Sequence, residues 1–331
     1  MAPRTVRPFG EARFRAMGTD AHVVVVAPNQ TEAQRLVVHA IDRIDHLERL
    51  WSRFDASSEV SELNRNAGEW VGVSPETMRL VGTADVATLA TQGVFDALVG
   101  RAVLNLGYDR SFDLIAGAAP IEDPSESGAH TYLHPTTRAR TDAARLSVCI
   151  PAGTSFDPGG IGKGLAADLI VAELVESGAD GAMVNLGGDL VVAGAPPDGE
   201  VWTITITEPA AGLHRPTTVG LVQGAVATST SRKRRWTQGA AEVHHIVDPA
   251  TGQNPTGEVV LATVITGAGW WAEAVATSLV GRDLLIDPPD GVAALLANMA
   301  GTIRTYGDFA EYEIEGPSAH AGPSARQGVL R

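Results

Sequence analysis

The stretch FDPGGIGKGLAADLIVAELVESGADGAMVNLGGDLVVAG runs from Phe156 to Gly194 and places an acid, a glycine-rich turn and Lys163 at the start of a predicted helix. A strand and a second glycine turn, Asn185 to Asp189, follow that helix. Glycines let the backbone approach a ligand without a Cβ, and a helix N-terminus offers unpaired N–H groups and partial positive charge to phosphate. Such turns also occur only to pack a helix on a sheet, so both interpretations stay open here.

Outward from this stretch, the sequence predicts further helices and strands on both sides. Residues 21–27 are β-branched and apolar, as in a buried strand. Thr31 is the expected cap of a helix whose apolar residues recur at helical spacing, and Ser74 is the expected cap of a helix from Pro75 to Thr91. The helix after Lys163 ends near Gly178. Strands are then expected at 181–186, 190–193, 201–207, 218–222, 225–229, 243–247 and near 259–265, helices at about 270–280 and at 291–299, and a last strand near 308–314.

This order of elements predicts an α+β fold with mixed or antiparallel sheets and packed helices. Residues 118–145 are rich in Pro, Ser, Gly and charge and predict a long surface excursion with one short strand at most. With no clean linker, residues 1–314 are expected to form one interlocked domain, with two subdomains as the alternative. Residues 315–331 are expected to be a disordered tail.

The composition excludes several classes of protein. The net charge of −14 argues against nonspecific binding to nucleic acid or to an anionic membrane. The single cysteine, Cys149, excludes an internal disulfide and lies in an apolar run typical of a buried thiol. No apolar run reaches the length of a membrane span, and residues 1–20 lack a secretory signal. The expected location is therefore the cytoplasm, or outside it if this sequence is the trimmed form of an exported protein.

Two segments in the first third of the chain combine aromatic and acidic residues. Trp51 and Phe54 lie at a helix end, where they could stack on a planar ring or form a hydrophobic clamp. The segment from Ser57 to Asn64 is polar enough to order a loop. Asp96, after Phe95, lies in an apolar run and needs a partner, which could be a ligand amide or the following turn.

Two segments in the last third carry groups suited to acid–base chemistry and metal binding. His245 precedes a tight-turn signal, Asp248 to Gly252, and fits either a general base or a satisfied histidine beside a turn. Glu273 and Thr277 are four residues apart, so on a helix they share one face. They could offer two oxygens to one hard cation such as Mg²⁺, or they could simply contact each other on a solvated face.

Taken together, these segments resemble the FAD:protein FMN transferase family, also called the ApbE or flavin transferase family. The resemblance runs from about Met17 to about Val280. It is carried by Met17-Gly18-Thr19, Ser52-Arg53-Phe54 with Glu59-Val60-Ser61, Phe95-Asp96, Asp157 to Gly164, Val184 to Asp189, Ala227-Thr228-Ser229 and His245 to Gly252. It implies an ApbE-like, T-fold-like architecture.

The resemblance also implies a function and a set of site residues. The implied reaction is a Mg²⁺-dependent transfer of FMN from FAD to a Thr or Ser hydroxyl of a partner flavoprotein, with release of AMP. The implied FAD contacts are Met17, Phe54, Phe95, Asp96, Asp157, Lys163 and Ile246, and the implied metal ligands are the carbonyl of Gly160 with Glu273 and Thr277. The family usually has Asp where Glu273 stands and Ala where Gly162 stands, which puts the metal preference in question.

Phosphoryl transfer of this kind depends on positioning and charge neutralisation, which Lys163, the helix N-terminus and Mg²⁺ would provide. His245 is the candidate for orienting or deprotonating the acceptor hydroxyl, and Asp157 for assisting catalysis or for holding the flavin or the water around the metal. Two other functions remain open: a Mg²⁺-dependent FAD pyrophosphatase, with water in place of the acceptor, and a non-catalytic FAD-binding protein.

Overall fold

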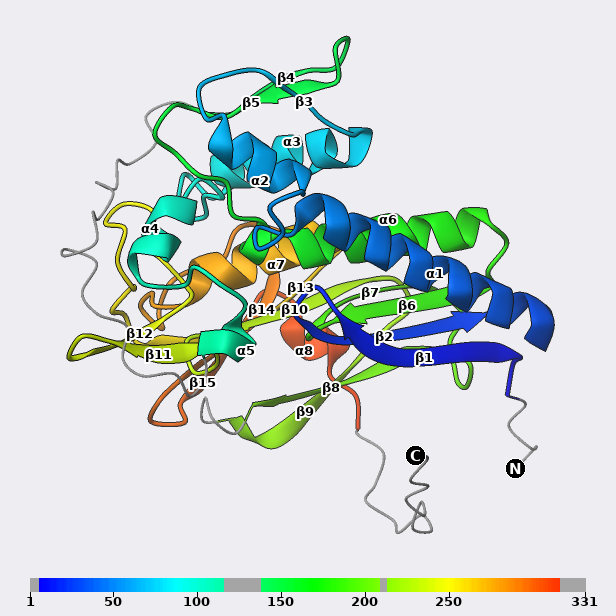
Figure 1. The fold of residues 1–331 in the computed structure, drawn as a ribbon. Coiled ribbons are helices and arrows are strands. Elements are labelled where there is room, and N and C mark those ends of the chain that lie inside the picture. The colour runs from blue at the N-terminus through cyan, green and yellow to red at the C-terminus, as the bar shows by residue number, and fades with distance from the viewer. Residues whose placement is uncertain (1–5, 116–137, 209–212, 316–331) are drawn as a thin grey trace.

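The computed structural model describes residues 6–115, 138–208 and 213–315 (Figure 1). Its centre is an eight-stranded sheet in the order β1-β2-β6-β7-β10-β13-β14-β15, and each neighbouring pair is antiparallel. The sheet takes strands from both ends of the chain. Its strands are β1 (Phe9–Ala16), β2 (Thr19–Val26), β6 (Gly181–Leu186), β7 (Asp189–Gly194), β10 (Gly224–Thr230), β13 (Val259–Thr266), β14 (Ala293–Asn298) and β15 (Ile303–Tyr306).

Three helices cover one face of this sheet, α1 (Gln30–Trp51), α6 (Gly162–Glu176) and α7 (Gly269–Leu279) (Figure 1). Helix α6 contacts β6 and β7 and lies against both α1 and α7, so its residues are buried almost all round. A single 3-10 turn, η2 (Pro158–Gly160), leads into α6 at the glycine-rich sequence. This arrangement brings the N-terminus of α6 to the edge of the helical layer.

The other face of the sheet is covered by a hairpin of β8 (Trp202–Glu208) and β9 (Leu213–Leu221), with α8 (Phe309–Tyr312) beside it. Side chains such as Trp202, Val219 and Phe309 pack there against β2, β7 and β13. Because both faces are covered, β2 is apolar at successive positions instead of alternating. No helix in the described ranges is long and apolar enough to span a membrane.

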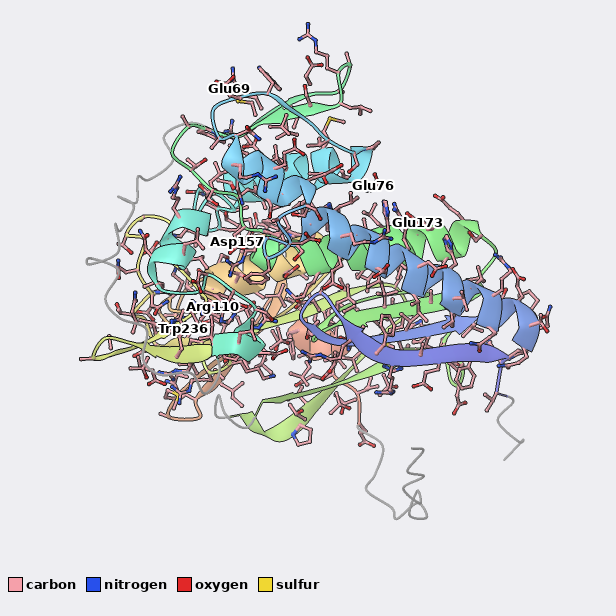
Figure 2. The ribbon with its side chains drawn as sticks, viewed as in Figure 1. Glu69, Glu76, Arg110, Asp157, Glu173 and Trp236 are labelled. Carbon is pink, nitrogen blue, oxygen red and sulfur yellow. The ribbon has the colours of Figure 1, made fainter. Side chains whose placement is uncertain are left out.

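The remaining elements surround the helical layer. Helices α2 (Glu59–Arg65) and α3 (Pro75–Ala90) lie next to a small sheet of β3 (Val71–Gly72), β5 (Ser147–Cys149) and β4 (Arg140–Asp142) (Figure 1). Helices α4 (Gly100–Asn105) and α5 (Phe112–Ile115) pack against the hairpin of β11 (Arg235–Gln238) and β12 (Ala241–His244). A separate apolar cluster that includes Tyr108 and Trp236 joins them (Figure 2).

The α+β class with antiparallel sheets is confirmed, and most predicted elements are present. Ser74 caps α3 as predicted, but the cap of α1 is Asn29, whose side chain accepts from the N–H of Glu32, and not Thr31. The polar segment after Ser57 forms α2, not a loop, because Ser58 caps it and Val60 and Leu63 are buried. Cys149 is buried and free.

Two predictions near the C-terminus are wrong. Residues 291–299 were expected to be helical, but β14 occupies Ala293–Asn298 and pairs with both β13 and β15. Pairing on both edges and burial on both faces overrides the helix propensity of its alanines and leucines. The strand expected near 308–314 is the short helix α8. The predicted tail lies outside the described residues except for Glu315, and most of the 118–145 excursion also lies outside them.

Candidate active site

A cavity of about 1360 Å³ lies where the turns of the main sheet meet the N-terminus of α6. It exceeds the ~300–1000 Å³ typical of small-ligand sites and has room for a dinucleotide. Every site residue predicted from the sequence lines it: Met17, Phe54, Phe95, Asp96, Asp157, Gly160, Lys163, His245, Ile246, Glu273 and Thr277. The structure therefore brings together residues that are up to 260 positions apart in the chain; the roles predicted for them remain predictions.

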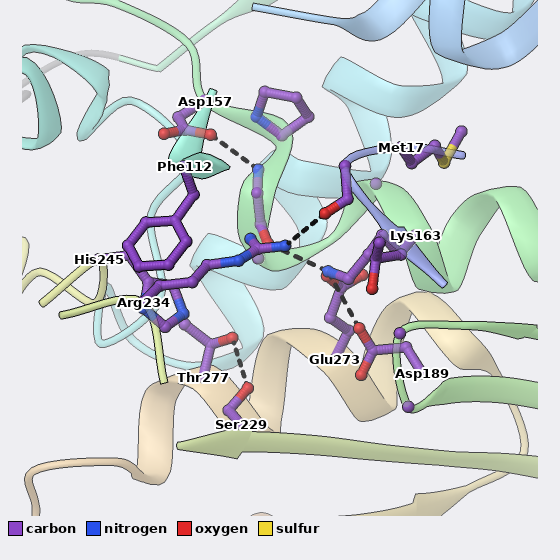
Figure 3. A pocket seen from close by; sticks show the side chains of 18 of the residues that line it. Met17, Phe112, Asp157, Lys163, Asp189, Ser229, Arg234, His245, Glu273 and Thr277 are labelled. Carbon is purple, nitrogen blue, oxygen red and sulfur yellow. Dashed lines mark hydrogen bonds and ion pairs between the residues drawn. The ribbon is translucent and has the colours of Figure 1, made fainter. Parts of the chain in front are cut away.

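Lys163 lies between two buried carboxylates that also line this cavity (Figure 3). Its Nζ is 3.0 Å from Oδ2 of Asp189 and forms a second ion pair with Oε1 of Glu273. Burial alone would lower the pKa of Lys163, but the charges of Asp189 and Glu273 outweigh it and raise that pKa. Lys163 is therefore a charged ammonium across the physiological range.

The side chain of Glu273 connects α7 to the N-terminus of α6. Its Oε2 accepts a hydrogen bond of 2.8 Å from the N–H of Gly164, one of the donors that the sequence left available to a phosphate. Burial raises the pKa of Glu273 and Asp189 adds to that effect, while Lys163 and the Gly164 N–H act against it. Asp at this position would be one methylene shorter, and the extra length lets Glu273 reach both partners.

Helices α6 and α7 approach each other so closely that glycine is required at the contact. A Cβ on Gly164 would lie 2.2 Å from the carbonyl oxygen of Gly269. On the next turn of α6, Asp168 accepts hydrogen bonds from the N–H groups of Gly269 and Trp270, at 2.7 and 2.9 Å. These contacts hold the first turn of α7, and with it Glu273, in register with Lys163.

Hydroxyl groups lie beside the carboxylates on α7 and β10. Oγ1 of Thr277 is 3.1 Å from Oγ of Ser229. Gly160 faces Thr277, because a Cβ on Gly160 would lie 3.4 Å from Thr277 Oγ1 and 3.0 Å from the Phe95 ring. The predicted metal ligands Gly160, Glu273 and Thr277 all line the cavity, and they would offer hard oxygens of the kind that Mg²⁺ binds together with substrate phosphates and water. No group of three or more His, Cys, Asp or Glu suited to a metal occurs in the described ranges.

An aromatic wall lies on the side of the cavity formed by the end of α1. The guanidinium of Arg53 lies 4.2 Å from the centre of the Phe54 ring and 4.4 Å from that of Tyr108, and its Nε is 3.4 Å from Oδ2 of Asp157. Phe54 remains 43 % exposed, so one aromatic face is accessible to a planar ligand. Asp157 also accepts from the N–H of Gly159 at 2.8 Å, which shapes the glycine turn.

His245 lines the cavity near Thr277 (Figure 3). Its Nδ1 is buried and has no hydrogen-bond partner among the residues that the structure describes. Burial, followed by the charge of Arg234, lowers the pKa of His245 to about 3. The ring is therefore neutral near pH 7 and is only a weak base in this arrangement. The tight turn predicted after it is present, with the Gly252 N–H donating to the Asp248 carbonyl at 2.8 Å.

Of the two partners predicted for Asp96, a ligand amide or the following turn, the structure shows the turn. Oδ1 of Asp96 accepts a hydrogen bond of 2.8 Å from the N–H of Leu98.

Sequence reasoning did not select Asp189 or Arg234 as site residues. Asp189 directly follows the second glycine turn, and Arg234 lies in the basic run from Arg232 to Arg235. Both signals were visible, but nothing local indicated that either side chain faces Lys163.

The sequence and the fold are similar to those of known proteins. A protein of Vibrio cholerae named FAD:protein FMN transferase is 27 % identical over 289 residues, which cover 86 % of this chain and 81 % of that protein. One of the same name from Treponema pallidum is 27 % identical over 291 residues, 82 % of this chain and 78 % of that one. The crystal structure of the ApbE protein of Thermotoga maritima superimposes with a TM-score of 0.77 at 27 % identity, covering 93 % of this chain and all of that one.

The class of protein defined by these likenesses is an α+β enzyme that acts as a transferase. The model of the ApbE family matches residues 17–296, and the chain belongs to this family.

Proposed function

We propose that this protein is a Mg²⁺-dependent FAD:protein FMN transferase, which moves FMN from FAD to a Thr or Ser hydroxyl of an acceptor flavoprotein and releases AMP. Membership of the ApbE family and the names of its relatives support the use of FAD and of a protein acceptor. The observation that carries the proposal is the Lys163 ammonium, held by Asp189 and Glu273 beside a glycine turn in a cavity large enough for FAD.

The reaction needs charge stabilisation more than covalent help from the protein. The acceptor oxygen forms a bond to the phosphorus of the FMN half, the phosphoanhydride bond to AMP breaks, and the hydroxyl proton leaves. Lys163 and the N–H groups at the start of α6 lie at the cavity and would stabilise negative charge on the phosphoryl oxygens. His245, a neutral ring and a weak base, would orient the acceptor hydroxyl, and the hydroxyl proton would pass to bulk water.

The carbonyl of Gly160, the carboxylate of Glu273 and the hydroxyl of Thr277 would hold Mg²⁺. When bound, the ion would supply charge neutralisation for the diphosphate. Glu273 would then share its carboxylate between that role and the contacts it makes with Lys163 and Gly164. Asp189 would keep Lys163 in place while it does so, because its ion pair with Lys163 does not involve Glu273.

The flavin end of FAD would lie along the apolar and aromatic wall. Phe54 offers an accessible ring, and Phe95 and Ile246 are buried apolar side chains at the cavity. Asp96 and Asp157 are carboxylates on the same wall that could accept hydrogen bonds from the ring system. Met17 contributes an apolar side chain from the β1–β2 turn.

The decisive experiment is incubation of the protein with FAD, MgCl₂ and a flavoprotein that carries an acceptor Thr. The expected product is an acceptor that keeps flavin fluorescence after denaturing electrophoresis, with a mass increase of one FMN group and one AMP released per acceptor. The variant Glu273→Ala is expected to bind FAD but to lose Mg²⁺-dependent product. AMP released at the same rate without acceptor would indicate a pyrophosphatase instead, and bound FAD without product with any acceptor would contradict the transferase.

A further inference from the structure

Arg234 lies in the turn between β10 and β11 and reaches across the cavity (Figure 3). Its Nη2 donates a hydrogen bond of 3.3 Å to the carbonyl of Gly18, in the turn between β1 and β2. One guanidinium thus joins two turns that are more than 200 positions apart in the sequence. This hydrogen bond uses one of its five N–H donors, so most of the others are available to a ligand.

The backbone at both ends of this contact is in an unusual conformation. Arg234 has φ +48° and Met17, next to Gly18, has φ +50°. Non-glycine residues seldom adopt the left-handed region, and such conformations cluster at ligand-binding sites. The left-handed backbone of Arg234 lies in a turn whose arginine side chain lines the cavity.

The charge of Arg234 is not neutralised in the way that other cavity cations are. Four other basic side chains that line the cavity, Arg13, Arg15, Arg53 and Lys163, each contact a carboxylate. Within the described ranges Arg234 contacts a carbonyl and no carboxylate. Its charge also acts on Lys163 and His245, where it disfavours the protonated forms. An anion placed between Arg234 and Lys163 would relieve the repulsion between these two positive charges.

We propose that Arg234 is a binding residue for the phosphate groups of the ligand and forms, with Lys163, a phosphate subsite of the cavity. A guanidinium presents a planar fork that binds two phosphate oxygens at once. In a protein of net charge −14, such a local clamp is needed to hold a diphosphate. The identification of these phosphates as the diphosphate of FAD rests on the proposed function; the phosphate subsite itself does not.

The test is calorimetric titration of the full chain with AMP, inorganic pyrophosphate and riboflavin, which has no phosphate. Arg234→Gln keeps a side chain of similar length and removes the charge, so AMP and pyrophosphate are expected to bind about 10-fold to 100-fold more weakly, with riboflavin affinity unchanged. Arg234→Lys is expected to lie between the two, because it keeps the charge but not the fork. Arg35→Gln, on the exposed side of α1, is the matched control and should behave as wild type.

An equal loss of riboflavin and AMP binding in Arg234→Gln would overturn the subsite, because it would show a merely structural role for the arginine. Unchanged AMP binding in that variant, or no binding of AMP and pyrophosphate to wild type, would overturn it as well. The two proposals fail separately. Arg234-dependent AMP binding without flavinylation contradicts only the transferase, whereas flavinylation with the same KM for FAD in Arg234→Gln contradicts only the subsite.

Discussion

Nζ of Lys163 lies 3.0 Å from Oδ2 of Asp189, and the two side chains are only 18 % and 6 % exposed. Asp189 comes from the start of β7 and Lys163 from the first turn of α6, so the ion pair joins the sheet to the helical layer. Because Glu273 also contacts Lys163, this one ammonium separates two carboxylates that would otherwise repel each other in a buried site.

Removal of the Lys163 charge is therefore expected to destabilise the protein. Lys163→Met keeps the side-chain length and leaves Asp189 and Glu273 without a cation, and the free energy of unfolding at pH 7 should fall by about 3 kcal/mol. This loss of unfolding free energy should be smaller at pH 5. Burial already raises the pKa of Glu273, so in the variant its carboxylate takes up a proton and no longer needs a cation. Urea denaturation at both pH values measures this. Arg304→Met, at an exposed cation of β15, is the control, and an equal loss in both variants would contradict the expectation.

The stability of the fold should depend on pH through His245. Its pKa is lowered from an ordinary value of about 6.5 to about 3, mainly by burial, so between these values the unfolded chain binds one more proton than the folded chain. The stability it contributes is present above pH 6.5 and is lost as the pH falls toward 3. His245→Gln should flatten the dependence by about 1.4 kcal/mol per pH unit near pH 5.

Urea unfolding of wild type and His245→Gln at pH 4.5, 5.5 and 7 measures this slope. The neighbouring His244, whose pKa burial lowers to about 4, contributes a slope of the same sign and remains in both proteins. Parallel pH profiles for the two proteins would show that His245 is already free to take up a proton in the folded state.

Gly164 should tolerate no side chain, although alanine is the better helix former. In Gly164→Ala the new Cβ would meet backbone atoms of Gly269 and Trp270 at 2.2 to 2.8 Å, which would force α6 and α7 apart. A loss of more than about 3 kcal/mol of stability is expected. Gly82→Ala, in the helix α3 with nothing within 4 Å, should instead stabilise by up to about 1 kcal/mol. Thermal unfolding of the pair checks both directions; similar shifts would refute the clash.

Asp168 is expected to stabilise the start of α7. Asp168→Ala leaves the N–H groups of Gly269 and Trp270 without their acceptors and should cost about 2 kcal/mol, whereas Asp168→Asn keeps one acceptor oxygen and should cost less. Asp180→Ala, at an exposed position, serves as the control and should change the unfolding free energy by less than about 0.5 kcal/mol. Equal stability of all three variants in chemical denaturation would argue against this role.

Glu273→Asp should alter the response to Mg²⁺. The shorter side chain cannot reach Lys163 and the Gly164 N–H together, so its carboxylate competes less with those contacts and should bind Mg²⁺ more tightly. The expected results are a larger rise in melting temperature with added MgCl₂ and a lower Mg²⁺ concentration for half-maximal activity. A smaller thermal shift than in wild type would mean that the length of Glu273 is needed for the ion.

Much of the fold was predictable because its signals are local. Ser74 before Pro75, the β-branched run of β2 and the glycine turn before α6 each specify their element within a few residues. The strand β14 was not predictable in this way, because its apolar run has no alternation and its alanines and leucines favour helix. Only pairing with β13 and β15, and burial on both faces, makes it a strand.

In the candidate site too, local features were predictable from the sequence and long-range contacts were not. By itself the sequence determined which residue types are present and which share a helix face, as with Glu273 and Thr277, because four-residue spacing follows from helix geometry alone. The tertiary structure decided that Asp189 holds Lys163, that Glu273 accepts a hydrogen bond from the first turn of α6 and that Arg234 crosses to Gly18. Those contacts depend on the packing of distant elements and on the burial that makes an unpaired charge costly, and neither is encoded in local sequence spacing.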